Sequence, residues 1–171
     1  IVIPVFNDTS SISNLIARIS DTTKKNDYST EIILVDDGSK EESFDFLIKL
    51  KERMHNTEMK VIRLPKNKGQ AIATFTGLLY AEGDYIVTLD SDLQHPPEEI
   101  PRLISSLIDN SADLAYGTAT EGHTLGYRLI RSPYKCVTRL FRQGNYIDAS
   151  SFRCMNSRTA YEFKNTPDLF F

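Results

Sequence analysis

The feature that most restricts the possible folds of this chain is a repeated switch between two hydrophobic periods. Short runs rich in Ile, Val and Leu predict β-strands at 1–6, 31–36, 59–64, 84–90 and 113–118. Between these runs the apolar residues are spaced as on one face of a helix, in three sets: Ile12, Leu15, Ile16 and Ile19; Ile72, Phe75 and Leu79; Ile100, Leu103, Ile104 and Leu107. Strand followed by helix, repeated, predicts an α/β fold with a mostly parallel central sheet covered by helices.

Composition fits one domain with its own core. The chain has 171 residues, of which 40% are hydrophobic. Its net charge is −3 and its basic residues are scattered, so we expect no binding to nucleic acid. The two cysteines, Cys136 and Cys154, have no companion pair, which argues against a zinc cluster or a disulfide scaffold, and we expect both to be reduced.

The pattern weakens after about residue 119. The polar, glycine-containing stretch 120–127 predicts a mobile loop, and Pro133 is placed to begin a helix. A short strand within 146–154 and a helix at 157–165 complete the prediction. No apolar run reaches the ~20 residues that a membrane-spanning helix needs. The sequence begins at "IVIPVF" without an initiator Met and stops at "PDLFF", so we expect it to be a piece of a longer protein.

Polar clusters follow the predicted strands at their carboxyl ends. They read "PVFND", "VDDGS", "LPKNKG" and "LDSDLQH". In an open parallel sheet these ends share one edge, and ligands bind there. The sequence therefore predicts a ligand site at this edge.

The cluster after the fourth of these strands predicts a divalent cation. Asp90 and Asp92 are two residues apart, so in an extended chain their carboxylates point the same way, and Gln94 follows if the extension persists. Two adjacent carboxylates repel unless a cation lies between them. Mg²⁺ or Mn²⁺, held by one or two carboxylates with water and phosphate oxygens completing the shell, fits this pattern. An isolated motif of this kind is more often a solvated acidic turn, but its place after a buried strand favours the metal.

The other clusters could bind a nucleotide, or they could simply form turns and helix starts. Asp36 or Asp37 can accept a hydrogen bond from a base N–H or a ribose hydroxyl, but Asp, Gly and Ser also make turns and helix caps. Lys68 can reach a diphosphate and Gly69 permits a close backbone approach, although the same residues suit an ordinary helix entry.

Taken together and in order, "IVIPVFND", "EIILVDDGS" and "RLPKNKGQAIATFTGLLYAEGDYIVTLDSDLQHPPEEIPRLI" resemble the family 2 glycosyltransferases of the GT-A fold, over about residues 1–118. "LDSDLQHPPE" is similar to the "LDADLQDPPE" stretch of the branch that includes dolichol-phosphate mannose synthases and GtrB-type polyprenyl-phosphate glycosyltransferases. "SSFRCMNSRTA" is similar to that branch's "GDFRLMDRR" segment.

The resemblance implies a Rossmann-like, three-layer α/β/α fold, a donor site and a reaction. It places Pro4, Phe6 and Asn7 around the base and ribose, Asp37 on the base, and Asp90, Asp92 and Gln94 on a Mn²⁺ or Mg²⁺ ion at the donor diphosphate. The implied enzyme moves a sugar from a UDP- or GDP-sugar, with inversion, to a polyprenyl phosphate or a glycan precursor in cell-envelope polysaccharide synthesis. One catalytic domain would span 1–171, with a nucleotide-sugar-binding half (1–118) and a partial acceptor-side half (119–171). The full-length protein would work at the cytoplasmic face of the membrane.

The chain departs from the branch where the aspartate of "GDFR" would be, since Ser151 stands there. Asp148 is then the nearest carboxylate and our candidate general base for a hydroxyl acceptor, whereas a lipid phosphate is already anionic and needs none. Four nearby residues could clamp a phosphate or simply form the solvated face of an amphipathic helix: Arg128, Arg131, Ser132 and Lys135.

Two alternatives remain at this stage. A haloacid-dehalogenase-like phosphatase also carries a metal-binding D-x-D at a strand end, but it uses its first strand, and here the motif follows a later one. A non-catalytic nucleotide-sugar-binding module is the other alternative, suggested by Ser151 and by the early stop of the chain.

Overall fold

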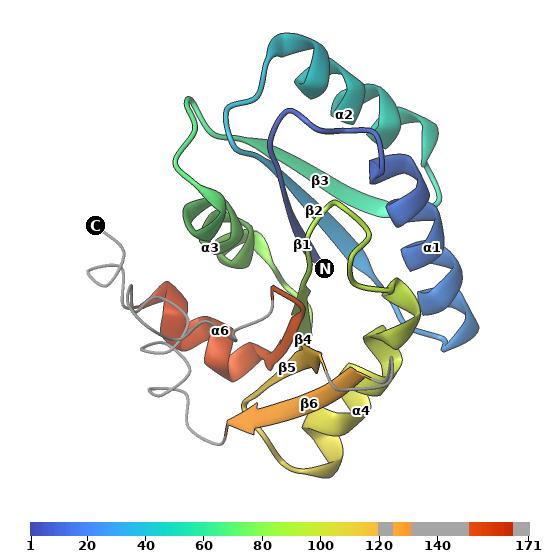
Figure 1. Ribbon diagram of the computed structural model, residues 1–171, viewed down its shortest axis with the longest axis vertical. Helices are drawn as coiled ribbons and strands as arrows, with labels where there is room; N and C mark the ends of the chain where they lie inside the picture. Colours follow the sequence, from blue (N-terminus) through green and yellow to red (C-terminus); the bar gives the residue numbers. More distant parts are fainter. Residues whose placement is uncertain (120–124, 131–150, 166–171) are drawn as a thin grey trace.

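The computed structural model describes residues 1–119, 125–130 and 151–165 (Figure 1). Its elements are β1 (Val2–Val5), α1 (Ile12–Lys25), β2 (Glu31–Asp36), α2 (Glu41–Arg53), β3 (Glu58–Arg63), α3 (Gln70–Tyr80), β4 (Tyr85–Thr88), the short 3₁₀ helix η1 (Pro97–Glu99), α4 (Ile100–Asp109), β5 (Leu114–Ala119), β6 (Leu125–Ile130), β7 (Arg153–Asn156) and α6 (Ser157–Lys164). The first five predicted strands and the predicted helices of the first 110 residues are confirmed.

The strands form one sheet in the order β3-β2-β1-β4-β7-β5-β6. The pairs β3–β2, β2–β1 and β1–β4 are parallel. β7 is antiparallel to both of its neighbours, β4 and β5, and β6 is antiparallel to β5. β5 therefore runs in the same direction as the first four strands, so the sheet is mostly parallel, as predicted.

Helices cover both faces of the sheet and make three layers (Figure 1). Alternate residues of a strand point to opposite faces. In β2, Ile32 and Leu34 therefore pack in the core beneath α1, α2 and α4, while Ile33 and Val35 pack in the core beneath α3 and α6. All four side chains are fully buried. The consecutive apolar residues of this strand thus reflect burial on both faces.

Three details differ from the sequence prediction. Leu79 is 40% exposed, and Leu78 takes the buried place on α3. Residues 125–127, expected in a loop, belong to β6 and pair with β5. The strand expected within 146–154 begins only at Arg153. The helix expected from Pro133 lies outside the described residues.

The topology creates a crevice between β1 and β4. From β1 the chain proceeds through α1 and α2 toward β3 at one edge; it then returns through α3, on the opposite face, to β4 on the other side of β1. At such a switch point the loops that follow the two strands diverge to opposite faces and leave room for a ligand. Among the helices that the structure describes, none combines the length and apolar character that crossing a membrane requires.

Candidate active site

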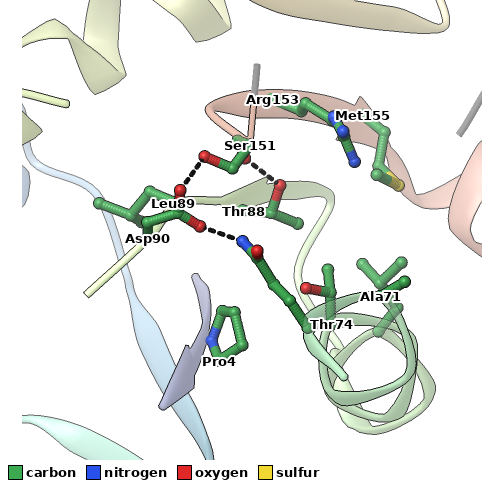
Figure 2. Close-up of a pocket in the computed structure, with 11 residues that line it drawn as sticks. Pro4, Ala71, Thr74, Thr88, Leu89, Asp90, Ser151, Arg153 and Met155 are labelled. Atoms are coloured by element: carbon green, nitrogen blue, oxygen red, sulfur yellow. Dashed lines mark hydrogen bonds between the residues drawn. The ribbon is translucent and has the colours of Figure 1, made fainter. Parts of the chain in front are cut away.

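Two adjoining cavities open at the carboxyl ends of β1 and β4. The first, which we call the outer cleft, is lined by Pro4, Val5, Phe6, Asp37, Asn67, Gly69, Gln70, Asp90, Ser91 and Asp92. The second, the inner chamber, lies between α3, β4 and β7 and is lined by Pro4, Gln70, Ala71, Thr74, Leu78, Thr88, Leu89, Asp90, Ser151, Arg153 and Met155 (Figure 2). Pro4, Gln70 and Asp90 belong to both cavities. Asp90 therefore stands where the two meet.

Asp37 braces the loop that leads into α3. Its Oδ1 accepts a hydrogen bond from the Lys68 backbone N–H at 2.7 Å, and its Oδ2 accepts one from the Gly69 N–H at 2.8 Å. The Asp37 residue is only 3% exposed. Gly69 needs its glycine because its φ is +90°. The carboxylate that we predicted on the base thus has both oxygens engaged by the protein backbone, and the exposed Lys68 enters this contact through its N–H.

Asp36 and Asn7 are also engaged in structural contacts. The fully buried Asp36 accepts from the Ser39 N–H at 3.2 Å and lies 3.3 Å from Arg63 Nε. Asn7 has a positive φ of 59°, and its side-chain oxygen accepts the Lys40 N–H at 3.1 Å. These contacts tie the loops after β1 and β2 together. Neither residue lines the outer cleft, whereas Pro4 and Phe6 do, and Phe6 is 46% exposed there.

The chain after β4 turns sooner than an extended strand would. Leu93 adopts a left-handed φ of 64°, and the Gln94 N–H donates back to Asp92 Oδ1 at 3.0 Å. The extension on which we based the placement of Gln94 therefore does not persist. Asp90 and Asp92 both line the outer cleft, while Gln94 is exposed and does not.

Asp90 is held from two sides by residues that sequence reasoning did not select for this role. The Gln70 side-chain amide, at the start of α3, donates to Asp90 Oδ1. The Ser151 hydroxyl, just before β7, donates to Asp90 Oδ2 at 2.5 Å. Thr88 fixes Ser151 in turn, because its hydroxyl donates to the Ser151 carbonyl oxygen at 2.7 Å. In Figure 2, Ser151 and Thr88 lie on one side of Asp90, with Pro4, Ala71 and Thr74 on the other.

Arg153 brings a positive charge into the inner chamber. It follows Ser151 by two residues and lies opposite Thr88 in the sheet. Burial lowers the pKa of its guanidinium to about 10, and the nearby Asp90 carboxylate acts against that fall. The group is therefore still protonated near neutral pH. The similarity of "SSFR" to "GDFR" was the one sequence signal that could have identified it.

Two further side chains have structural surroundings. The His95 ring stacks on the Phe152 ring with centroids 5.5 Å apart and 14° between the planes, so the turn after Asp92 packs against the residue just before β7. Cys154 is a buried free thiol, and burial raises its pKa to about 12. This agrees with the expectation that Cys154 is reduced. Cys136 lies outside the described residues.

The donor set at the junction fits a hard divalent cation that shares its ligands with phosphate. Within residues 1–119, 125–130 and 151–165, no group of three or more His, Cys, Asp or Glu side chains could hold a metal ion. Mg²⁺ and Mn²⁺ sites, however, commonly use one or two carboxylates and complete the shell with water and substrate oxygens. Asp90 and Asp92 share the outer cleft, and each Asp90 oxygen keeps lone-pair capacity beyond the one hydrogen bond it accepts.

The remaining predicted residues fall mainly outside the described part of the chain. These are Arg131, Ser132, Lys135 and Asp148, so the phosphate clamp and the general base stay predictions. Arg128 is placed by its backbone only: it lies in β6 opposite Tyr116, which in turn lies opposite Arg153.

Comparison with known proteins indicates the family and the fold. The sequence model of glycosyl transferase family 2 matches residues 1–164. A relative from Pseudomonas syringae pv. syringae (strain B728a), undecaprenyl-phosphate 4-deoxy-4-formamido-L-arabinose transferase, is 36% identical over 155 residues, covering 91% of this chain and 45% of its own length. The chain thus spans less than half the length of this relative.

Two solved structures share the fold. The mannosyltransferase PcManGT from Pyrobaculum calidifontis, in complex with GDP-Man and Mn²⁺, matches with a TM-score of 0.64 at 17% identity, over 91% of this chain and 43% of that one. Glucosyl-3-phosphoglycerate synthase from Mycobacterium tuberculosis, with Mn²⁺ and UDP-glucose, matches with a TM-score of 0.60 at 19% identity, over 92% and 55%. The fold is therefore the expected GT-A fold. With the family model covering nearly its whole length, the chain belongs to glycosyl transferase family 2.

Proposed function

We propose that this chain binds the donor in a metal-dependent glycosyltransferase that moves a sugar from a UDP- or GDP-sugar to a polyprenyl phosphate in cell-envelope polysaccharide synthesis. One observation carries the proposal. Asp90 and Asp92, from the loop after β4, line one cleft together with Phe6 and Gly69, and this cleft lies at the β1/β4 switch point. Membership of family 2 sets aside the phosphatase alternative. Attachment at the cytoplasmic face of the membrane is part of the same proposal.

Different residues of the outer cleft would bind the base, the diphosphate and the metal ion of a nucleotide sugar. The exposed face of Phe6 offers a stacking surface for the base. The first turn of α3, which begins at Gln70, opens into both cavities and presents the positive end of the helix dipole to a diphosphate. Asp90 and Asp92 would hold Mn²⁺ or Mg²⁺, which when bound supplies positive charge against the negative charge that grows on the leaving diphosphate.

The carboxylates near the two cavities favour an anionic acceptor. Among the described residues, the carboxylates that line the cavities are those of Asp37, Asp90 and Asp92. Asp37 is only 3% exposed and braces the loop before α3, and Asp90 and Asp92 are the proposed metal ligands. None of these three is therefore our candidate base; that candidate, Asp148, lies outside the described residues, and Ser151 stands where the branch has an aspartate. A lipid phosphate is already ionised near neutral pH and attacks without losing a proton to the protein, so we favour it over a glycan hydroxyl.

Arg153 suits an approaching phosphate. Arg153 lines the inner chamber together with Asp90, and its guanidinium stays charged near neutral pH. Arginine pairs well with phosphate oxygens because its planar group presents several N–H donors. Together with Arg131, Ser132 and Lys135, which lie outside the described residues, it would attract the anionic acceptor toward the anomeric carbon, which we expect to be attacked with inversion.

Calorimetry with UDP and GDP, each with and without Mn²⁺, tests the proposal. We expect one nucleotide to bind in a Mn²⁺-dependent manner, and we expect Asp92→Ala to abolish that dependence. Asp45→Ala, which removes an exposed carboxylate on α2, is the matched control and should bind like the parent protein. Equal affinity in Asp92→Ala and the parent would overturn the metal assignment. Tight nucleotide binding without any sugar transfer to a polyprenyl phosphate would instead favour the non-catalytic module.

A further inference from the structure

The Asp90 carboxylate is fixed by two donors that come from distant parts of the chain. Gln70, on its Oδ1, lies 20 residues before it at the start of α3, and Ser151, on its Oδ2, lies 61 residues after it at the entry to β7. These contacts join the helix α3 to the chain just before β7. Both end on the Asp90 carboxylate, and Figure 2 shows Asp90 with Ser151 on one side of it.

Two donors, one on each oxygen, restrict the rotation of a carboxylate that is otherwise nearly free. The terminal torsion of aspartate is broad, so an unsupported carboxylate samples many orientations. Asp92 shows the contrast, because it is exposed and its Oδ1 accepts a hydrogen bond from the Gln94 N–H of its own loop. Asp90 is thus oriented by tertiary structure and Asp92 by the local turn.

The chemistry of the two supports suits a cation site. Gln70 and Ser151 are both neutral donors, so they orient Asp90 without cancelling its charge or competing for the metal as acidic ligands. The Ser151 backbone is itself anchored by the Thr88 hydroxyl.

We propose that Gln70 and Ser151 are positioning residues that hold the Asp90 carboxylate in the orientation that binds the divalent cation. The proposal rests on the proposed function, because it assumes that Asp90 is a metal ligand. Groups that hydrogen-bond to metal ligands typically contribute about 10- to 100-fold to metal affinity. Loss of either donor should therefore weaken Mn²⁺ binding by about 10-fold or more, with little change in metal-free nucleotide binding or in folding.

Electron paramagnetic resonance of free Mn²⁺, titrated with protein at a fixed concentration of UDP or GDP and compared with the same nucleotide without protein, measures this affinity. We expect Gln70→Ala and Ser151→Ala each to raise the Mn²⁺ dissociation constant about 10- to 100-fold. Ser151→Thr keeps the hydroxyl and should restore affinity to within about twofold of the parent. Thr74→Ala is the matched control, since Thr74 lines the same inner chamber from α3 and, among the described contacts, has no hydrogen bond to Asp90. Circular dichroism melting without metal checks that each variant is folded.

The possible outcomes separate the two proposals. If the parent binds Mn²⁺, Asp92→Ala does not, and both alanine variants bind like the parent, the positioning role is wrong while the proposed function stands. If Thr74→Ala loses as much affinity as the alanine variants, the loss reflects general disturbance of the chamber and the positioning role is again wrong. If the parent itself binds no Mn²⁺ with either nucleotide, both proposals fail together.

Discussion

Replacing Asp37 with alanine tests whether this carboxylate braces the loop before α3 or is reserved for the nucleotide base. The substitution removes the acceptor for two backbone N–H groups, those of Lys68 and Gly69, at 2.7 and 2.8 Å. If the bracing contacts are its main role, the nucleotide-free protein loses stability. If Asp37 serves the base alone, the nucleotide-free protein is unaffected.

The expected loss follows from the number and environment of these hydrogen bonds. A hydrogen bond to a charged group contributes about 1.5 to 3 kcal/mol, so two would contribute about 3 to 6 kcal/mol if no water replaced the carboxylate. Lys68 is exposed and Gly69 half-buried, which lets water satisfy part of the vacated sites. Removing a buried charge also recovers some desolvation free energy. We therefore expect the free energy of unfolding to fall by about 2 to 3 kcal/mol.

Urea unfolding followed by far-ultraviolet circular dichroism, without nucleotide or metal, measures the loss. With an m-value of about 2 kcal/mol/M, the midpoint of Asp37→Ala should fall by about 1 to 1.5 M. Asp37→Asn, which keeps one acceptor oxygen, should lie between Asp37→Ala and the parent. Asp45→Ala on the exposed face of α2 should stay within about 0.5 kcal/mol of the parent. A midpoint for Asp37→Ala equal to that of the parent would refute the bracing role and return Asp37 to the base.

Two further predictions concern other residues of the described structure. Gly38 and Gly69 both have a positive φ, of 68° and 90°. A Cβ added to Gly38 would clash with the Lys66 backbone, whereas a Cβ added to Gly69 would meet no atom within 4 Å. Urea unfolding should therefore show that Gly38→Ala costs about 1 to 3 kcal/mol more than Gly69→Ala, and equal losses would contradict the close approach. Burial raises the pKa of the Cys154 thiol from 9.0 to about 12. The protonated thiol therefore contributes its full stability below pH 9.0, and this contribution is lost as the pH rises through about 12. Peptide mapping after iodoacetamide at pH 8 should find Cys154 unmodified in the folded protein and modified in urea, whereas alkylation in the folded state would contradict its burial.

The elements and the edge that carries the site could be predicted because they depend on local order along the chain. Apolar period distinguishes strand from helix, and alternating strands and helices give a parallel sheet whose carboxyl ends share one edge. This reasoning predicted that the clusters after β1 and β4 share one edge, and Phe6 and Asp90 do line one cleft. It did not predict the turn before Gln94, because a single left-handed residue, Leu93, ends the extended chain and no periodic pattern indicates such a turn.

The contacts that hold the site depend instead on residues far apart in sequence. β7 lies between β4 and β5, antiparallel to both, although it follows them in the chain. That insertion is what brings Ser151 onto Asp90 and Arg153 into the inner chamber. Likewise, only the folded loop shows that the Asp37 oxygens meet backbone N–H groups. The sequence determined which residues could bind a cation and a nucleotide; the tertiary structure decided how each carboxylate is used, because hydrogen-bond partners are set by packing between distant elements.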